Sequence, residues 1–251
     1  MQVFRKIIIV FVGFLSFYAL SQVQEITRDL STNPAKSTIM TRFSPPKGYI
    51  WEMYPADSFE EYLVNFPLKP NGLPVRDYRK IPIEKQYHHA AILDIDVGDK
   101  DLQQCADAWI RLYAEYLWKR KRYDEIVFEF TSQQKLSWND YKNGIRTREI
   151  ENGERVIFQK TETYQDDYKA FREYLNLVFR YAGTISLDRE SHSILKTNEI
   201  KVGDFIITPG SPGHTVFVVG SAKNHLGKRI FLLAQGFMPA QDVQIIKNPN
   251  N

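Results

Sequence analysis

The residues best able to carry out covalent chemistry in this sequence are a single cysteine and one of five histidines. Cys105 is the only cysteine, and it opens the stretch CADAWIRLYAEYLW, whose apolar residues recur at helical spacing. In the first turn of a helix, free backbone N–H groups and the helix dipole stabilise a thiolate. The pattern indicates either a nucleophile or, in the simpler alternative, a small apolar side chain that packs in the core.

A nucleophilic thiolate needs a general base that is near in space, and His214 is the best-placed histidine. It follows the flexible segment PGSPG (209–213) and opens the apolar run TVFVV, which predicts a strand with His214 at its mouth. Gln235 interrupts the apolar run IFLLA on the next predicted strand. If the loop between the two strands is 223–226, Gln235 faces His214 and can orient its imidazole. A one-residue change in that loop would turn Gln235 to the other face.

The same hypothesis names groups that would stabilise a tetrahedral intermediate. The backbone N–H of Cys105 lies at the predicted helix start, and Gln103 or Gln104 supplies a neighbouring amide. Gly213, just before the histidine, would let a substrate approach the backbone closely. No metal and no other cofactor takes part in this chemistry.

The elements that must hold these residues run from helices to strands along the chain. The long helix begins near residue 102, after a strand predicted at 90–98, and a second amphipathic helix spans 166–183 with Gly183 as its C-cap. Further elements are a helix at 58–66 and strands at 125–130, 155–160, 203–209, 214–222, 228–237 and 242–247. This order predicts an α+β fold in which the long helix packs on a C-terminal antiparallel β-sheet.

The chain begins with a pattern typical of a secretory signal peptide. Arg5 and Lys6 precede an apolar run at 7–19, and Ala19-Leu20-Ser21 resembles a cleavage site. We expect residues 1–21 to be removed, because the run is short for a membrane span; an uncleaved anchor is the alternative. No cysteine is available at this site for lipid attachment. The protein is therefore expected to be exported, periplasmic or extracellular, with no membrane span after signal removal.

Composition narrows the function classes further. The hydrophobic fraction of 43% predicts a packed core, and the formal net charge of +3 gives no case for nucleic-acid binding. Residues 22–41 are polar and predict a flexible lead-in, and 42–251 contain no clear linker and predict one globular α+β domain. The sequence does not indicate an oligomeric state.

The order of these features resembles the papain-like superfamily, and most of all its bacterial cell-wall branch, the NlpC-type endopeptidases and CHAP amidases. The matching features are Cys105 at a helix start, Gly203-Asp204 at the start of a strand, His214 opening the next strand and Gln235 on the strand after it. The resemblance implies a papain-like core and a cysteine peptidase or amidase that acts on peptide or peptidoglycan. The sequence departs from the usual Asp-Cys-Ser/Gly pattern, because it reads Gln-Cys-Ala here.

A second resemblance spans nearly the whole mature chain. The blocks DLQQCADAWIRLYAEYL, RYAGTISL, GSPGHTVFVV and LLAQGFMPAQD resemble an exported Bacteroidetes family classed as a domain of unknown function. This resemblance implies a bacterial cell-envelope or secreted protein and no particular activity.

Other functions stay open at this stage. A non-catalytic envelope protein could bind a peptide or glycan on the same fold, with Tyr49, Trp51, Tyr54, Trp138 and Tyr141 as candidate groove residues. Metal binding is less favoured: adjacent His88 and His89 point to opposite faces of a strand, and the acidic residues around Gly98 lack the calcium-loop order. A glycosidase with paired carboxylates has no specific pattern to support it.

Overall fold

The structure is a computed structural model of the chain that describes residues 4–7, 31–150 and 155–247. Its strands are β1 (Phe4–Ile7), β2 (Ser31–Thr32), β3 (Phe43–Ser44), β4 (Tyr49–Trp51), β5 (His89–Ile92), β6 (Val127–Glu129), β7 (Lys135–Ser137), β8 (Ile145–Ile150), β9 (Arg155–Lys160), β10 (Ser191–Ile194), β11 (Phe205–Thr208), β12 (His214–Asn224), β13 (Arg229–Gln235) and β14 (Gln244–Ile246). Its α-helices are α2 (Ile39–Arg42), α3 (Phe59–Val64), α4 (Cys105–Lys119), α5 (Trp138–Lys142), α6 (Tyr168–Tyr181) and α7 (Thr184–Arg189), and short 3-10 turns are η1 (Gln86–His88), η2 (Tyr123–Glu125) and η4 (Thr197–Glu199).

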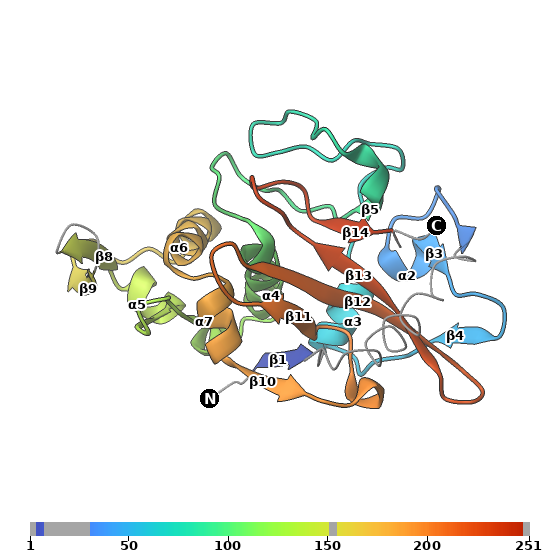
Figure 1. Ribbon diagram of the computed structural model, residues 1–251. Helices are drawn as coiled ribbons and strands as arrows, with labels where there is room; N and C mark the ends of the chain where they lie inside the picture. The colour runs from blue at the N-terminus through green and yellow to red at the C-terminus, as the bar shows by residue number, and fades with distance from the viewer. Residues whose placement is uncertain (1–3, 8–30, 151–154, 248–251) are drawn as a thin grey trace.

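A mixed eight-stranded sheet forms the centre of this arrangement (Figure 1). The order of its main path is β10-β1-β11-β12-β13-β14-β5, and β4 pairs with the end of β12 that β11 does not reach. Pairing is antiparallel from β11 to β5, whereas β1 lies parallel to both of its neighbours. The α+β class is confirmed, and so is the antiparallel C-terminal part of the sheet; the sheet as a whole is mixed.

The long helix α4 lies against β12 and β13, as the sequence predicted. Its start is capped by Asp107, whose carboxylate accepts the backbone N–H of Gln104 at 3.1 Å. Almost every α4 residue up to Leu117 is buried, since α3 contacts the helix as well as the sheet. Trp109 fixes the helix to the sheet, because its indole N–H donates to the carbonyl of Gly203 at 2.8 Å.

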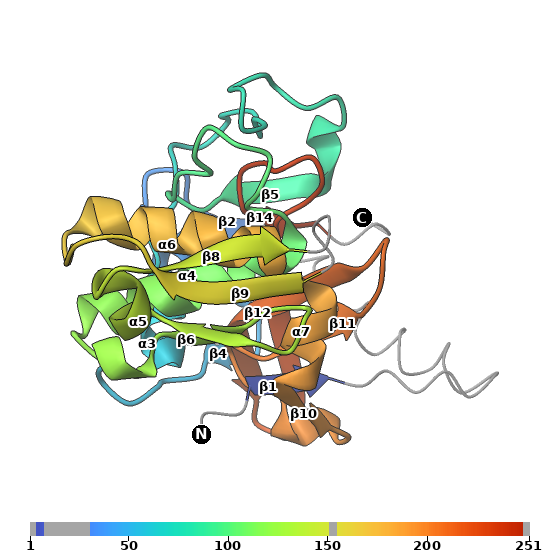
Figure 2. The same cartoon turned by 90° about the vertical axis from the view of Figure 1, so that its left-hand side faces the viewer.

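A second group of elements lies beside the sheet. Figure 2 shows α6, α5 and the β8–β9 hairpin stacked together at one side of the molecule, next to α4. The aromatic rings between them are closely packed: Trp118 at the end of α4 stacks on Phe171 of α6 at 4.2 Å, and Trp138 of α5 packs edge-on against Phe171. This group therefore packs against the C-terminal end of α4.

Several predicted elements are confirmed with shifted ends. The helix predicted at 166–183 is α6, but its C-cap is Ala182; Gly183 instead precedes α7 in extended backbone, with φ of 172°. The strand predicted at 90–98 is shorter, since β5 ends at Ile92. The predicted 223–226 loop is longer in the structure, because Lys223 pairs with Arg229.

The N-terminal predictions fall partly outside the described residues. The cleavage site after Ser21 and most of the expected signal peptide lie in undescribed parts of the chain, but residues 4–7 form β1 within the sheet. In the segment expected to be a lead-in, Ile39 of α2 is fully buried in the core. In the described ranges, no helix combines the length and the apolar character that a bilayer crossing requires.

Candidate functional site

Cys105 is the first residue of α4, so its predicted place in the first helical turn is confirmed. The side chain lies near the start of β12: its thiol donates a long hydrogen bond, 3.9 Å, to the carbonyl oxygen of Gly213. Cys105 is 8% exposed, which makes it almost completely buried without being surrounded by apolar groups alone. This position combines the first residue of the long helix with restricted access from solvent.

His214 and Gln235 are in direct contact. The Nε2 atom of His214 lies 2.8 Å from the Oε1 atom of Gln235. An amide oxygen only accepts hydrogen bonds, so Nε2 carries the proton in the neutral ring and Nδ1 keeps its lone pair. The ring is also held by Phe237, which packs edge-on at 5.4 Å. Both contacts orient an imidazole whose Nδ1 atom can act as a base.

The thiol and the imidazole approach β12 from different sides. Phe217 is fully buried and pairs with Phe205, whose ring packs edge-on against Trp109 of α4 at 5.0 Å. Side chains alternate along a strand, so His214 lies on the face opposite to Phe217 and to α4. No hydrogen bond joins the thiol to the His214 ring in the described part of the chain. The two groups flank the start of β12.

Two glycines allow the elements of the site to pack this closely. A Cβ atom at Gly236, the residue after β13, would lie 2.7 Å from the carbonyl oxygen of Gln104 and 2.9 Å from the Cβ of Ala108. A Cβ atom at Gly213 would lie 2.2 Å from the hydroxyl oxygen of Thr184. A side chain at either position would push the helix start or the 209–213 segment away from the sheet.

Thr184 holds the segment that covers the thiol. Its hydroxyl donates to the carbonyl of Gly210 at 3.1 Å and accepts the backbone N–H of the same residue at 3.2 Å. Thr184 is nearly buried at the start of α7, which is remote in sequence from both Cys105 and His214. Sequence reasoning missed this residue, because nothing local marks a threonine that binds a loop so far along the chain.

The candidate oxyanion residues have different surroundings. Gln103 is 1% exposed, and its Oε1 atom accepts a hydrogen bond from Arg111 at 2.9 Å. Gln104 is half-buried, and its Nε2 atom donates to Asp101 at 3.1 Å. The backbone N–H of Cys105 lies in the first turn, where the helix itself offers no acceptor. Of the two glutamines, Gln104 is therefore the more accessible.

Asp107 is a further polar group at the helix start. Burial raises the pKa of its carboxyl well above the ordinary value, although the hydrogen bond from the Gln104 N–H acts in the opposite direction. An acidic residue at the third helical position is a recognised capping signal, and it could have been identified in the sequence.

The alternative binding residues are dispersed. Trp138 and Tyr141 are 1% and 5% exposed and pack against Tyr174 in the core, so they are not available to a ligand. Trp51 lies in β4, and its indole N–H donates to the carbonyl of Phe43 at 3.2 Å. Within residues 4–7, 31–150 and 155–247, no group of three or more His, Cys, Asp and Glu side chains is arranged to hold a metal ion.

Comparison with known proteins yields a family and no activity. No curated protein and no solved structure matches the chain. Residues 39–251 match the family described as Domain of unknown function (4846). The match includes α2, the whole of α4 and every strand of the sheet after β1. Since this range covers most of the chain, the protein belongs to the DUF4846 family.

Proposed function

We propose that this protein is an exported thiol hydrolase with a papain-like core that cleaves amide bonds of peptides or peptidoglycan. The observation that carries the proposal is the 2.8 Å contact between His214 and Gln235, next to the helix start that bears Cys105. A nucleophile at a helix start, a histidine on the facing strand and a polar group that orients the histidine are the parts such a site needs.

The proposed reaction uses the free nitrogen of the imidazole. Nδ1 of His214 accepts the thiol proton of Cys105, and the sulfur attacks the amide carbonyl carbon to form a tetrahedral intermediate. The backbone N–H of Cys105 and the Gln104 side chain stabilise the oxyanion. The intermediate expels the amine, which takes the proton from His214. Water, activated by the same imidazole, then hydrolyses the thioester and regenerates the thiol.

A movement near Gly213 is required before this reaction. The thiol must break its hydrogen bond to the Gly213 carbonyl, and the His214 side chain must move past the start of β12 to reach the thiol. Gly210 and Gly213 lie in the segment that would move, and glycine imposes the least steric limit on such a change. The described conformation is thus a closed form of the proposed enzyme.

The direct experiment compares hydrolysis of peptides and peptidoglycan fragments by the wild type, Cys105→Ala and His214→Ala. We expect each variant to lose at least about a hundredfold in rate, as removal of a nucleophile or general base does. His225→Ala is the matched control, because His225 is exposed in the β12–β13 turn. Unchanged hydrolysis by Cys105→Ala would reject the site.

A second candidate function rests on the low exposure of the cysteine. With Cys105 8% exposed and bonded to Gly213, the same fold could bind a peptide or glycan without cleaving it. Phe237, which packs against His214, is 45% exposed, and the next residue, Met238, is 54% exposed, so both offer apolar contacts to such a ligand. Ligand binding that persists in Cys105→Ala, combined with no turnover by the wild type, would favour this function.

The proposal of export has its own test. If residues 1–21 act as a signal peptide, the intact mass of the protein recovered from the bacterial periplasm or medium should match a chain that begins at Gln22. A full-length mass, or retention in the cytoplasm, would contradict export by this route.

A further inference from the structure

The four residues of β1 occupy a slot between two strands that are far from them in sequence. Phe4 to Ile7 pair in parallel with Ser191 to Ile194 of β10, residue by residue. On the other side, Lys6 and Ile7 pair with Phe205 and Ile206 of β11. Nothing in the described part of the chain other than β1 joins β10 to the rest of the sheet by strand pairing.

The first residue of β1 is an aromatic anchor. Phe4 is 7% exposed, and its ring packs edge-on against Trp109 at 4.9 Å and Tyr113 at 5.4 Å. Phe128 lies on another side of the ring at 6.4 Å. This pocket is built by α4 and β6, so it belongs to the body of the fold and not to the N-terminal segment.

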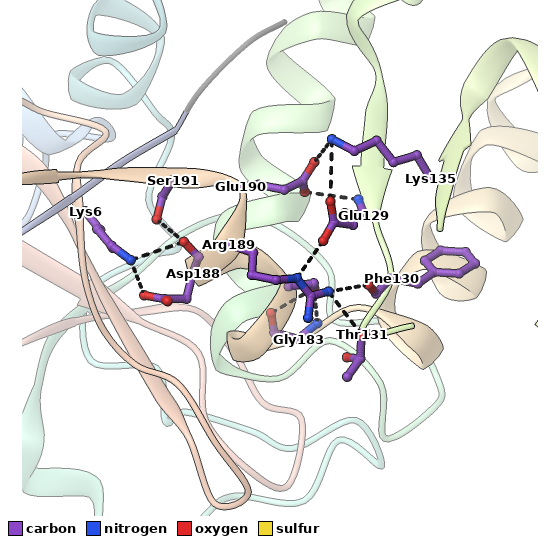
Figure 3. Close-up of polar contacts among 11 residues, drawn as sticks. Lys6, Glu129, Phe130, Thr131, Lys135, Gly183, Asp188, Arg189, Glu190 and Ser191 are labelled. Atoms are coloured by element: carbon purple, nitrogen blue, oxygen red, sulfur yellow. Dashed lines mark hydrogen bonds and ion pairs between the residues drawn. The ribbon is translucent and has the colours of Figure 1, made fainter. Parts of the chain in front are cut away.

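The next two residues are basic, and each meets an acidic side chain of the slot. Lys6 Nζ lies 2.6 Å from Asp188 Oδ1, and Figure 3 shows the lysine reaching this carboxylate at the end of α7. Arg5 Nε lies 3.1 Å from Asp204 Oδ1, whose side chain is 3% exposed. Glu190, next to β10 in sequence, is already paired with Lys135 at 3.1 Å.

The slot also has space beside its second position. A cavity of about 330 Å³ opens next to Arg5, and it is lined in part by His192, Ser193 and Lys201. The aromatic pocket and the two carboxylates constrain the positions of Phe4, Arg5 and Lys6.

Loss of β1 would leave backbone groups, an apolar pocket and a carboxylate without their partners. Backbone N–H and C=O groups of β10 and β11 would lose their partners, and an open strand edge readily pairs with another extended segment. The Phe4 pocket would open, and Asp204 would keep a nearly buried carboxylate without its Arg5 counter-ion.

We propose that, in the exported protein, the slot between β10 and β11 binds an extended segment of a partner protein that presents an aromatic residue, two basic residues and an aliphatic residue in that order. The segment adds a parallel strand where β1 lies, its aromatic ring enters the Trp109 pocket, and its basic side chains pair with Asp204 and Asp188. This inference rests on removal of residues 1–21, which is part of the proposed export, and it is independent of catalysis at Cys105.

The test measures binding of a fluorescent peptide, QVFRKII, to the exported chain by anisotropy. We expect saturable binding, and binding at least about tenfold weaker to the full chain, in which β1 competes for the slot. A full-length variant with Phe4→Asp, Arg5→Glu and Lys6→Glu is a second way to vacate the slot, because it weakens the binding of β1 there without removing residues. It should bind the peptide more tightly than the unmodified full chain.

A charge reversal identifies the binding site. Asp188→Lys in the exported chain should weaken binding of the peptide about tenfold, because one charge-assisted hydrogen bond is lost. A peptide with glutamate in place of its lysine should recover affinity for this variant. Asp166→Lys is the control, since Asp166 is an exposed acidic residue that accepts a hydrogen bond from the Tyr164 hydroxyl, and it should leave binding unchanged.

Three results would overturn the inference. The first is an exported chain whose mass still includes residues 1–21. The second is a processed and folded chain that fails to bind QVFRKII. The third is an Asp188→Lys variant that binds the peptide with the same affinity as the wild type. Because hydrolysis is measured with Cys105→Ala, failure of the proposed reaction would be recognised separately from failure of the slot.

Discussion

His214 and Gln235 are joined by a 2.8 Å hydrogen bond, although they are not directly opposite each other in the β12–β13 ladder. Phe217 pairs with Ala234, and continuation of that register places Val216 opposite Gln235. His214 is then the diagonal neighbour on the same face, at a separation that a glutamine and an imidazole can span. The contact therefore depends on both long side chains and on the register of the two strands.

Replacement of Gln235 should disorder the imidazole. In Gln235→Ala, Nε2 loses its acceptor and the ring can adopt the other tautomer, so we expect kcat for the proposed hydrolysis to fall by about a hundredfold with a smaller change in KM. Rates measured across a pH series should also show an altered profile. Gln159→Ala, at an exposed position of β9, is the control. If the two variants have the same kcat and KM, Gln235 has no role in orienting the imidazole.

A methyl group at Gly236 should separate the helix start from the sheet. The added Cβ would lie 2.7 Å from the Gln104 carbonyl, so we expect Gly236→Ala to lower the free energy of unfolding by about 1–3 kcal/mol in urea denaturation. Gly183→Ala is a matched control, because Gly183 has extended backbone and no neighbour within 4 Å of the added atom. If both variants unfold at the same urea concentration, the close packing at Gly236 is unimportant.

Release of the 209–213 segment should expose the cysteine. Thr184→Val keeps the shape of the side chain but removes both hydrogen bonds to Gly210. Two such bonds correspond to at least about a fivefold change in an opening equilibrium, so alkylation of Cys105 by iodoacetamide should accelerate by that factor or more. Thr163→Val, at an exposed position, should label like the wild type. A labelling rate unaffected by Thr184→Val would show that another element controls access.

Asp204 should make stability depend on pH. Burial raises the pKa of this carboxyl to about 6 from an ordinary 3.8, even with the Lys201 N–H and Arg5 acting in the opposite direction. The folded chain thus holds the proton more tightly than the unfolded chain, and the resulting stability is complete below pH 3.8 and is lost as pH rises through about 6.

Comparison with Asp204→Asn isolates this contribution, because asparagine can still accept the Lys201 N–H and does not titrate. Between pH 4 and pH 7 the full-length wild type should lose stability relative to the variant, on the order of 2 kcal/mol, in denaturation series at each pH. Parallel pH curves for the two proteins would mean that Asp204 titrates normally in the folded chain.

Local sequence features predicted much of the site. Cys105 at a helix start follows from the apolar periodicity of its own segment, and His214 at the mouth of a strand follows from the glycine- and proline-rich residues before it. Such features depend on neighbours within a few positions, so the sequence alone suffices to identify them. The family resemblance to a domain of unknown function likewise followed from blocks read directly in the chain.

The sequence predicted that His214 and Gln235 lie together, but it did so from a pairing of the two strands that differs from the observed one. The hairpin turn is longer than the predicted 223–226 loop, since Ala222 pairs with Ile230, and this difference alone would place Gln235 on the wrong face. A bulge at Val219 shifts the ladder back by one residue and returns Gln235 to the face of His214. Two independent shifts combined to preserve the face, and neither is encoded by local pattern.

The sequence by itself determined which segments become the long helix and the C-terminal strands, and that a cysteine and a histidine stand at their starts. Only the tertiary structure decided that the thiol meets Gly213 and not the imidazole, that Thr184 holds the segment between them, and that Phe4–Ile7 completes the sheet. Those contacts join residues far apart in the chain, and their geometry follows from strand register and packing across the whole core, which no short stretch of sequence specifies.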